Sequence, residues 1–267
     1  WSETGRKRTP PMERIRSALR AALKTVYPLM IYYMSVFAFT EIYRTAGFFP
    51  EDTVAVILPG AVLTAGILWF PYKKDWILRQ GLVKELRLKA PHHWEHLIIL
   101  GISSSITGNL LLSFTPLARW FPAVEEAVRE IADSGFWLQL TGVCLIIPVA
   151  EELIFRGIGY LSLRDEMGVV PAAVFSSGFF GLFHGNLVQG IYAAGLGLIL
   201  AFVMEKYQSL TAVWLTHAAM NIGSVYVLNG ILMPVSAEIP ALSVFMAVLA
   251  LGIAAAEIRR LQRTDFY

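Results

Sequence analysis

The sequence predicts an all-α fold, a polytopic membrane bundle of about eight transmembrane helices around a polar intramembrane cavity. Of its 267 residues, 56% are hydrophobic and only 16% are charged, whereas soluble domains carry about 25% charged residues. The apolar residues gather in runs long enough to cross a hydrocarbon core of ~30 Å. The single cysteine, Cys144, excludes an internal disulfide and a cysteine-based zinc cluster, and it is expected to be a buried apolar residue.

Eight apolar segments are predicted as membrane spans. They cover residues 26–46, 54–72, 97–118, 137–161, 169–186, 188–205, 209–228 and 240–257. The fourth is predicted to continue as one helix to about Leu163, with Pro148 favouring a kink. All eight are expected to form a single membrane domain over residues 1–267. Its parts are an N-terminal arm with three helices (1–119), a core that contains the later polar motifs (120–257) and a basic cytoplasmic tail (258–267).

The basic residues predict the orientation of the chain. With the N-terminus inside, 19 of the 22 Lys and Arg residues fall in inner segments, and only Arg44, Arg119 and Arg129 fall elsewhere. By the positive-inside rule, a multi-pass cell-membrane protein with both termini in the cytoplasm is expected. The long inner connection, 73–96, is predicted to form an amphipathic helix on an anionic leaflet. The long outer connection, 119–134, is predicted to form a short surface helix.

Three ionisable residues, Glu151, Glu152 and Arg156, interrupt the fourth apolar segment. A charge at mid-bilayer costs at least ~2.5–3.5 kcal/mol on insertion scales, so such residues are expected to pair or to perform chemistry. Glu152 and Arg156 lie four residues apart and can pair on one helical face, which leaves Glu151 free to face elsewhere. The structural alternative is an ionic lock between helices that has no reactive role.

Two later segments carry polar residues at a matching depth. His184 ends the sequence FGLFH, and His217 and Asn221 bound the sequence HAAMN one helical turn apart. At 1.5 Å per residue, these three residues and Glu151 all lie roughly 12–20 Å from the inner surface. A carboxylate and an imidazole can activate a shared water, which suits Glu151 and His184. An imidazole and a carboxamide on one helical face can donate to a developing oxyanion, which suits His217 and Asn221.

Neighbouring residues are predicted to shape the cavity. Phe180 would form one wall, and the Glu152 and Arg156 pair would hold Glu151 in position. Small residues on the fifth and sixth spans would allow the helices to approach closely. These are Gly178, Gly181, Gly185, Gly190, Gly195 and Gly197.

Taken in order, EELIFR, FGLFH and HAAMN resemble the EExxxR, FxxxH and HxxxN motifs of the CPBP family of glutamic-type intramembrane endopeptidases. This family includes type II CAAX prenyl proteases and bacteriocin-processing enzymes, and the resemblance covers about residues 138–228. It implies that Glu151 and His184 activate the water and that His217 and Asn221 form the oxyanion hole. It also implies that Glu152 and Arg156 support them, and that the reaction needs no metal or other cofactor.

Membrane lipids and a peptide substrate are the expected partners, and no feature suggests nucleic-acid binding. The resemblance allows a prenylated C-terminal peptide, a bacteriocin-like leader or a C-terminal sorting anchor as substrate. Two other functions stay open. In the first, Glu151, His184 and His217 bind zinc and leave a fourth position for water, although the chain has no HExxH pair. In the second, a non-catalytic scaffold or regulator uses the polar cavity to bind a tail peptide.

A second group of histidines, His92, His93 and His96, lies near the predicted inner interface. His92 and His96 have the i, i+4 spacing of metal ligands. Because they flank Trp94 at the start of a span, they are better explained as interfacial polar residues.

The charge distribution predicts opposite sides for two reporter positions. A fusion after Tyr267 and one inserted within residues 125–133 should report the cytoplasmic and the outer side, respectively, in paired enzymatic reporters. If both fusions report the same side, the eight-span arrangement is wrong.

Overall fold

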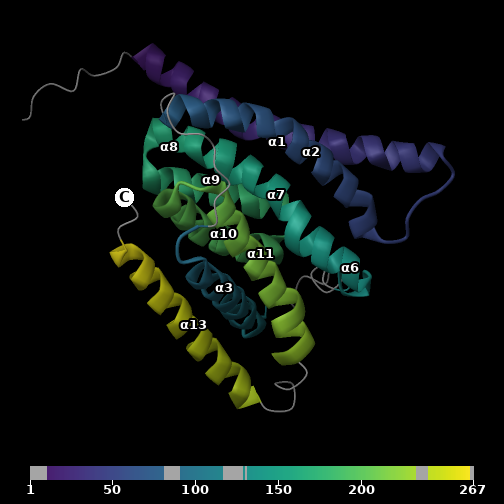
Figure 1. Cartoon of the computed structure of the whole chain (residues 1–267), viewed down its shortest axis with the longest axis vertical. Coiled ribbons are helices and arrows are strands. Elements are labelled where there is room, and N and C mark those ends of the chain that lie inside the picture. The colour runs from purple at the N-terminus through teal and green to yellow at the C-terminus, as the bar shows by residue number, and fades with distance from the viewer. Residues whose placement is uncertain (1–10, 81–90, 117–128, 130, 233–239, 265–267) are drawn as a thin grey trace, which may run out of the picture.

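The structure is a computed structural model that describes residues 11–80, 91–116, 129, 131–232 and 240–264 (Figure 1). Within these residues it contains no strand, and besides the helical residues 129 and 131–133 it forms eight helices. They are α1 (Pro11–Thr45), α2 (Thr53–Gln80), α3 (Trp94–Ser113), a composite helix (Phe136–Met167), α9 (Val169–Phe183), α10 (Leu187–Tyr207), α11 (Leu210–Ile222) with its continuation η3 (Gly223–Leu232), and α13 (Pro240–Arg263). The predicted all-α membrane bundle is confirmed.

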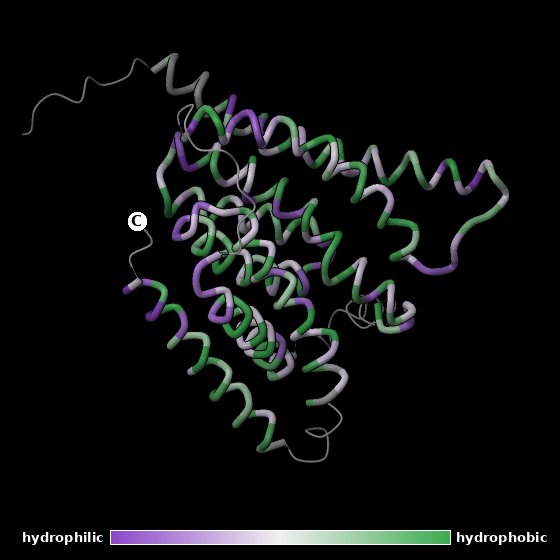
Figure 2. Tube along the Cα trace, in the orientation of Figure 1, coloured by the Kyte–Doolittle hydropathy of each residue, from purple (hydrophilic) through white to green (hydrophobic). Residues whose placement is uncertain are grey.

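Six helices in the described part of the chain are long and apolar enough to cross a membrane. They are Leu19–Thr45, Thr53–Arg79, Trp94–Ser113, Phe136–Met167, Leu187–Tyr207 and Ala241–Arg263. Figure 2 shows long apolar stretches along these rods and hydrophilic residues toward several of their ends. The α9 helix is apolar but, at 15 residues, shorter than these six. The α11 helix approaches the length of the six only when its continuation η3 is counted with it. The lengths and composition of the helices are therefore those of a multi-pass membrane protein.

Several helix boundaries differ from the predicted spans. The α1 helix begins at Pro11, within the basic arm, and α13 runs on to Arg263. Residues 73–80, predicted to start a separate surface helix, instead continue α2 to Gln80. Lys, Arg and Glu are good helix formers, so a helix can extend beyond the apolar run that marks its membrane-embedded part. The rest of that predicted surface helix up to residue 90, and most of the predicted outer helix at 119–134, lie outside the described residues.

The composite helix runs unbroken past Leu163, as predicted. It consists of α6 (Phe136–Leu138), η1 (Gln139–Ile146), α7 (Ile147–Glu152), η2 (Leu153–Tyr160) and α8 (Leu161–Met167). The η1 and η2 segments are π-helical, and the N–H of Ile147 bonds five residues back to the Gly142 carbonyl. At Pro148 the hydrogen bonding changes from π-helical to α-helical. Such wide turns within α-helices are frequent at functional sites.

The helices around α7 pack closely because glycines, which have no side chain, lie where they contact one another. A Cβ atom at Gly101 of α3 would lie 2.5 Å from the Thr216 carbonyl oxygen of α11. A Cβ at Gly181 of α9 would lie 2.5 Å from the Gly190 carbonyl oxygen of α10. Figure 1 shows α1 and α2 side by side along one side of this group, and α13 lying along α3 on the opposite side. Polar side chains at the level of α7 are therefore enclosed by helices.

Candidate active site

Residues 151–156 place two carboxylates and a guanidinium inside the bundle. The side chains of Glu152 and Arg156 are fully buried, and Glu151 is 8% exposed. The predicted pair is present: Arg156 Nη1 donates to Glu152 Oε1 at 3.0 Å. The desolvation free energy of two buried ions is offset only when both are well paired. Removing one partner of such a pair lowers the stability of the protein by about 3–5 kcal/mol. Both charges of this pair therefore lie on one face of the composite helix.

The Glu152 carboxylate also binds His217 of α11, which the sequence did not predict. Its Oε1 atom lies 2.6 Å from His217 Nδ1. Oε1 also accepts from Arg156, and an ionised carboxylate can only accept, so the imidazole donates to it through Nδ1. The other ring nitrogen, Nε2, lies 3.6 Å from Glu151 Oε2. Glu152, His217 and Glu151 thus form a row with the imidazole in the middle.

The Arg156 guanidinium is held by three further groups. Its Nη2 atom donates to the Gly197 carbonyl of α10 at 3.3 Å. Its Cζ atom lies 4.4 Å from the centre of the Phe180 ring and 5.9 Å from that of Phe155. A cation over an aromatic face is stabilised when both are desolvated. Phe180 therefore stabilises the Arg156 cation through its ring as well as forming an apolar surface of the site.

His184 follows the last residue of α9, and Phe180 contacts both its imidazole and that of His217. The ring contacts are T-shaped, with centroids 4.8 Å apart for His184 and 5.6 Å apart for His217. His184 Nδ1 is 2.8 Å from the Phe180 carbonyl oxygen, which only accepts, so Nδ1 carries a proton. Among the described residues, no hydrogen bond or ion pair joins His184 to Glu151.

Asn221 and Trp214 of α11 bind backbone carbonyls of the π-helical segment η1. Asn221 Nδ2 donates to the Val143 carbonyl and Trp214 Nε1 to the Leu145 carbonyl, each at 2.8 Å. In a π-helical register the Val143 carbonyl would bond the N–H of residue 148, but Pro148 has none. Asn221 supplies the missing donor and keeps one amide N–H for other use. A proline inside a predicted span indicates that a backbone carbonyl lacks its N–H donor, so Pro148 was the signal in the sequence for a side-chain donor such as Asn221.

Together, these observations define a class: a helical multi-pass membrane protein with a buried centre of paired carboxylates and imidazoles. Residues 133–223 match the family model described as type II CAAX prenyl endopeptidase Rce1-like. The matched segment, about a third of the chain, contains the EELIFR, FGLFH and HAAMN motifs. The resemblance to the CPBP family is therefore confirmed. The chain matches neither a curated protein nor a solved structure.

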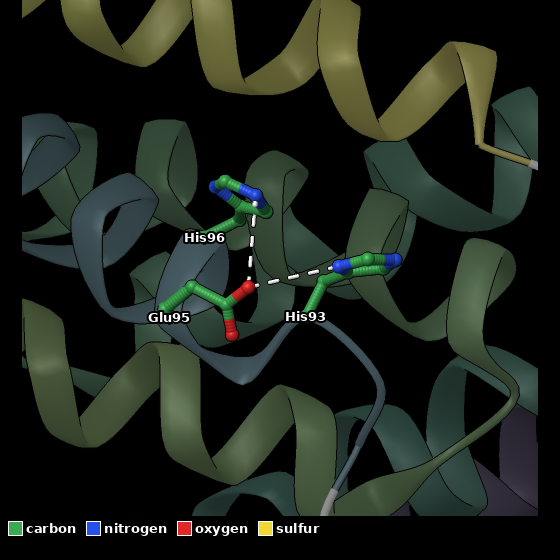
Figure 3. A group of neighbouring side chains, drawn as sticks. All are labelled: His93, Glu95 and His96. Carbon is green, nitrogen blue, oxygen red and sulfur yellow. Dashed lines mark ion pairs between the residues drawn. The ribbon is translucent and has the colours of Figure 1, made fainter.

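The metal-ligand spacing predicted from His92 and His96 is not formed. The α3 helix begins only at Trp94, so the segment before it does not follow helical i, i+4 geometry. In the described part of the chain, ligand atoms within 4.8 Å of one another come instead from His93, Glu95 and His96 (Figure 3). Glu151, His184 and His217 do not converge in this way.

The close approach of α10 to Arg156 can be tested with two neighbouring glycines. A Cβ at Gly197 would lie 2.9 Å from Ser177 Cβ and 3.1 Å from Arg156 Nη2, whereas a Cβ at Gly195 would meet nothing within 4 Å. Gly197→Ala should therefore lower stability by about 1–3 kcal/mol through overpacking, seen as a lower melting temperature in one detergent. Gly195→Ala is the matched control, and equal melting temperatures for the two variants would contradict this packing.

Proposed function

We propose that the protein is an intramembrane endopeptidase that hydrolyses a peptide bond of a substrate with a lipidated or otherwise hydrophobic tail. The Rce1-like match supports a CAAX-type intramembrane protease at the level of the family. The observation that carries the proposal is the placement of the Glu151 carboxylate, 3.6 Å from the Nε2 atom of a histidine whose Nδ1 is bound by Glu152. An ionic lock alone would need no second carboxylate at this imidazole.

In the proposed reaction Glu151 is the general base. It takes a proton from a water molecule, and the oxygen of that water attacks the carbonyl carbon of the peptide bond. In a neutral His184 imidazole, the lone pair on Nε2 can accept the second O–H of the same water and so orient it. The carbonyl π electrons move to its oxygen, which becomes an oxyanion. Collapse of this intermediate breaks the C–N bond, and the proton taken from water passes to the leaving amine.

His217 is proposed to stabilise the oxyanion together with Asn221. The proposed reaction starts from a neutral His217 imidazole, whose Nε2 has no proton to donate. Transfer of the water proton from Glu151 across the 3.6 Å gap would create an imidazolium held by Glu152 on one side. Its Nε2–H and the second amide N–H of Asn221 could then donate to the oxyanion. The Glu152 carboxylate would stabilise this imidazolium as the aspartate of a serine protease triad does.

The proposal predicts a loss of cleavage without a loss of folding in Glu151→Gln. The amide keeps the size of the side chain but cannot take a proton, so the rate should fall by roughly 10²–10⁴-fold, the usual contribution of a general base. Membrane peptides from cells carrying either form would be compared by mass spectrometry, with products missing and uncleaved precursors accumulating in the variant. Glu166→Gln, an exposed glutamate of the same composite helix, is the matched control.

Two further outcomes separate catalysis from the alternatives. Glu152→Gln and Arg156→Ala should reduce melting temperature as well as activity, since each leaves the other buried charge unmatched. If Glu151→Gln cleaves at the wild-type rate while folded, the catalytic proposal fails and the ionic lock or scaffold takes its place.

A glutamate-activated water predicts activity that survives removal of metal ions. Purified protein dialysed exhaustively against a chelator should cleave its substrate at an unchanged rate, because Glu151 and not a bound ion generates the nucleophile. Addition of Zn²⁺ afterwards should not raise that rate. Loss of activity on dialysis that Zn²⁺ restores would favour the zinc metalloprotease formed by Glu151, His184 and His217.

A further inference from the structure

A separate polar cluster lies where α3 begins and α13 ends. His93 directly precedes α3, and Glu95 and His96 lie in its first turn. His93 has a left-handed backbone with φ of 57°, which is uncommon for a residue other than glycine. In Figure 3 both histidine rings turn toward the Glu95 carboxylate. The proposed catalytic residues do not take part in this cluster.

The distances within the cluster are close to those between the ligands of one shared ion. Glu95 Oε1 lies 3.6 Å from His93 Nδ1 and 3.8 Å from His96 Nε2, which is longer than a normal N–H···O contact. Around a tetrahedral zinc with bonds of 2.0–2.1 Å, ligand atoms lie roughly 3.3 Å apart. All three ligand atoms are within 4.8 Å of one another. Small side-chain shifts would bring them to a common ion.

The second nitrogen of His96, Nδ1, lies beside a buried carboxylate of α13. His96 Nδ1 lies 3.0 Å from Oε2 of Glu257, a residue of α13 that is 8% exposed. Metal-ligating imidazoles almost always donate this other N–H to a carboxylate or carbonyl, which orients the ring and raises its basicity. In the structure Arg260 Nη1 contacts Nδ1 at 3.4 Å and lies 3.8 Å from Glu257 Oε1. Because a guanidinium only donates, the tautomer that binds a metal ion through Nε2 would turn its Nδ1–H to Glu257 and leave Arg260 paired with that carboxylate.

We infer that His93, Glu95 and His96 form a binding site for a divalent transition-metal ion, with zinc as the ion whose ligand preferences fit best. Two imidazole nitrogens and one carboxylate oxygen are ordinary zinc ligands, and a water would complete the tetrahedron. Glu257 would be the carboxylate that orients His96. Through that contact the ion would fasten the start of α3 to the end of α13. The site is independent of the proposed peptidase centre.

The test measures Zn²⁺ binding to the full-length protein, purified in detergent with an affinity tag that contains no histidine. We expect one Zn²⁺ per chain by elemental analysis after equilibration, a rise in melting temperature on adding Zn²⁺, and a visible absorption band typical of tetrahedral coordination with Co²⁺. His93→Gln and His96→Gln should abolish all three signals. Glu257→Gln should weaken binding on the order of 10–100-fold, the usual effect of removing such an orienting partner.

Matched variants make the result specific. His92→Gln lies next to the site but outside the group of ligands and should bind Zn²⁺ as the wild type does. Glu151→Gln should also bind normally, which distinguishes this site from a catalytic zinc. The Glu95 side chain is 48% exposed, so Glu95→Gln should fold normally but bind Zn²⁺ poorly. This variant keeps the test valid if a histidine variant fails to fold. The inference is overturned if no stoichiometric binding occurs, if His92→Gln loses it equally, or if Glu151→Gln removes it.

Discussion

One carboxylate oxygen, Glu152 Oε1, is the constraint on which the rest of the site depends. It accepts from Arg156 at 3.0 Å and lies 2.6 Å from His217 Nδ1, so it joins the composite helix to α11. An isolated charge at this depth would be costly, and pairing reduces this cost only when the geometry is maintained. The rotation of α7, the tautomer of His217 and the direction of Glu151 are therefore set together.

The backbone of the bundle is adapted to this polar centre. Gly197 leaves room for the guanidinium and offers it a carbonyl, while π-helical turns on both sides of α7 shift the register of the composite helix. The carbonyl that Pro148 leaves without a donor is bound by Asn221. A helix in lipid needs every backbone group satisfied, so Asn221, the side chain proposed for the oxyanion hole, also completes the hydrogen bonding of the helix that carries Glu151.

Hydrophobic runs and i, i+4 spacing predicted the all-α bundle, the continuous fourth helix and the Glu152–Arg156 pair, because these depend on local sequence alone. The contact between Glu152 and His217 spans 65 residues, and nothing local indicates which carboxylate an imidazole will choose. Spacing likewise suggested His92 and His96 as a pair, yet the helix that would align them starts after His92. Depth along each span placed His184 near Glu151, but the rotation of each helix about its axis, which decides which side chains meet, cannot be obtained from depth.

In the proposed reaction, the charge balance of the centre bears on where a proton can reside. With both carboxylates ionised, Arg156 charged and His217 neutral, the buried groups carry one net negative charge in a medium that stabilises charge poorly. A proton taken from water would bring this sum to zero, whether it rests on Glu151 or passes to His217 Nε2, 3.6 Å away. The oxyanion formed at the same moment would restore the negative charge next to its donors. The centre therefore keeps a constant total charge while the charge moves from carboxylate to substrate, a step that a dry, preorganised site can accommodate with little rearrangement.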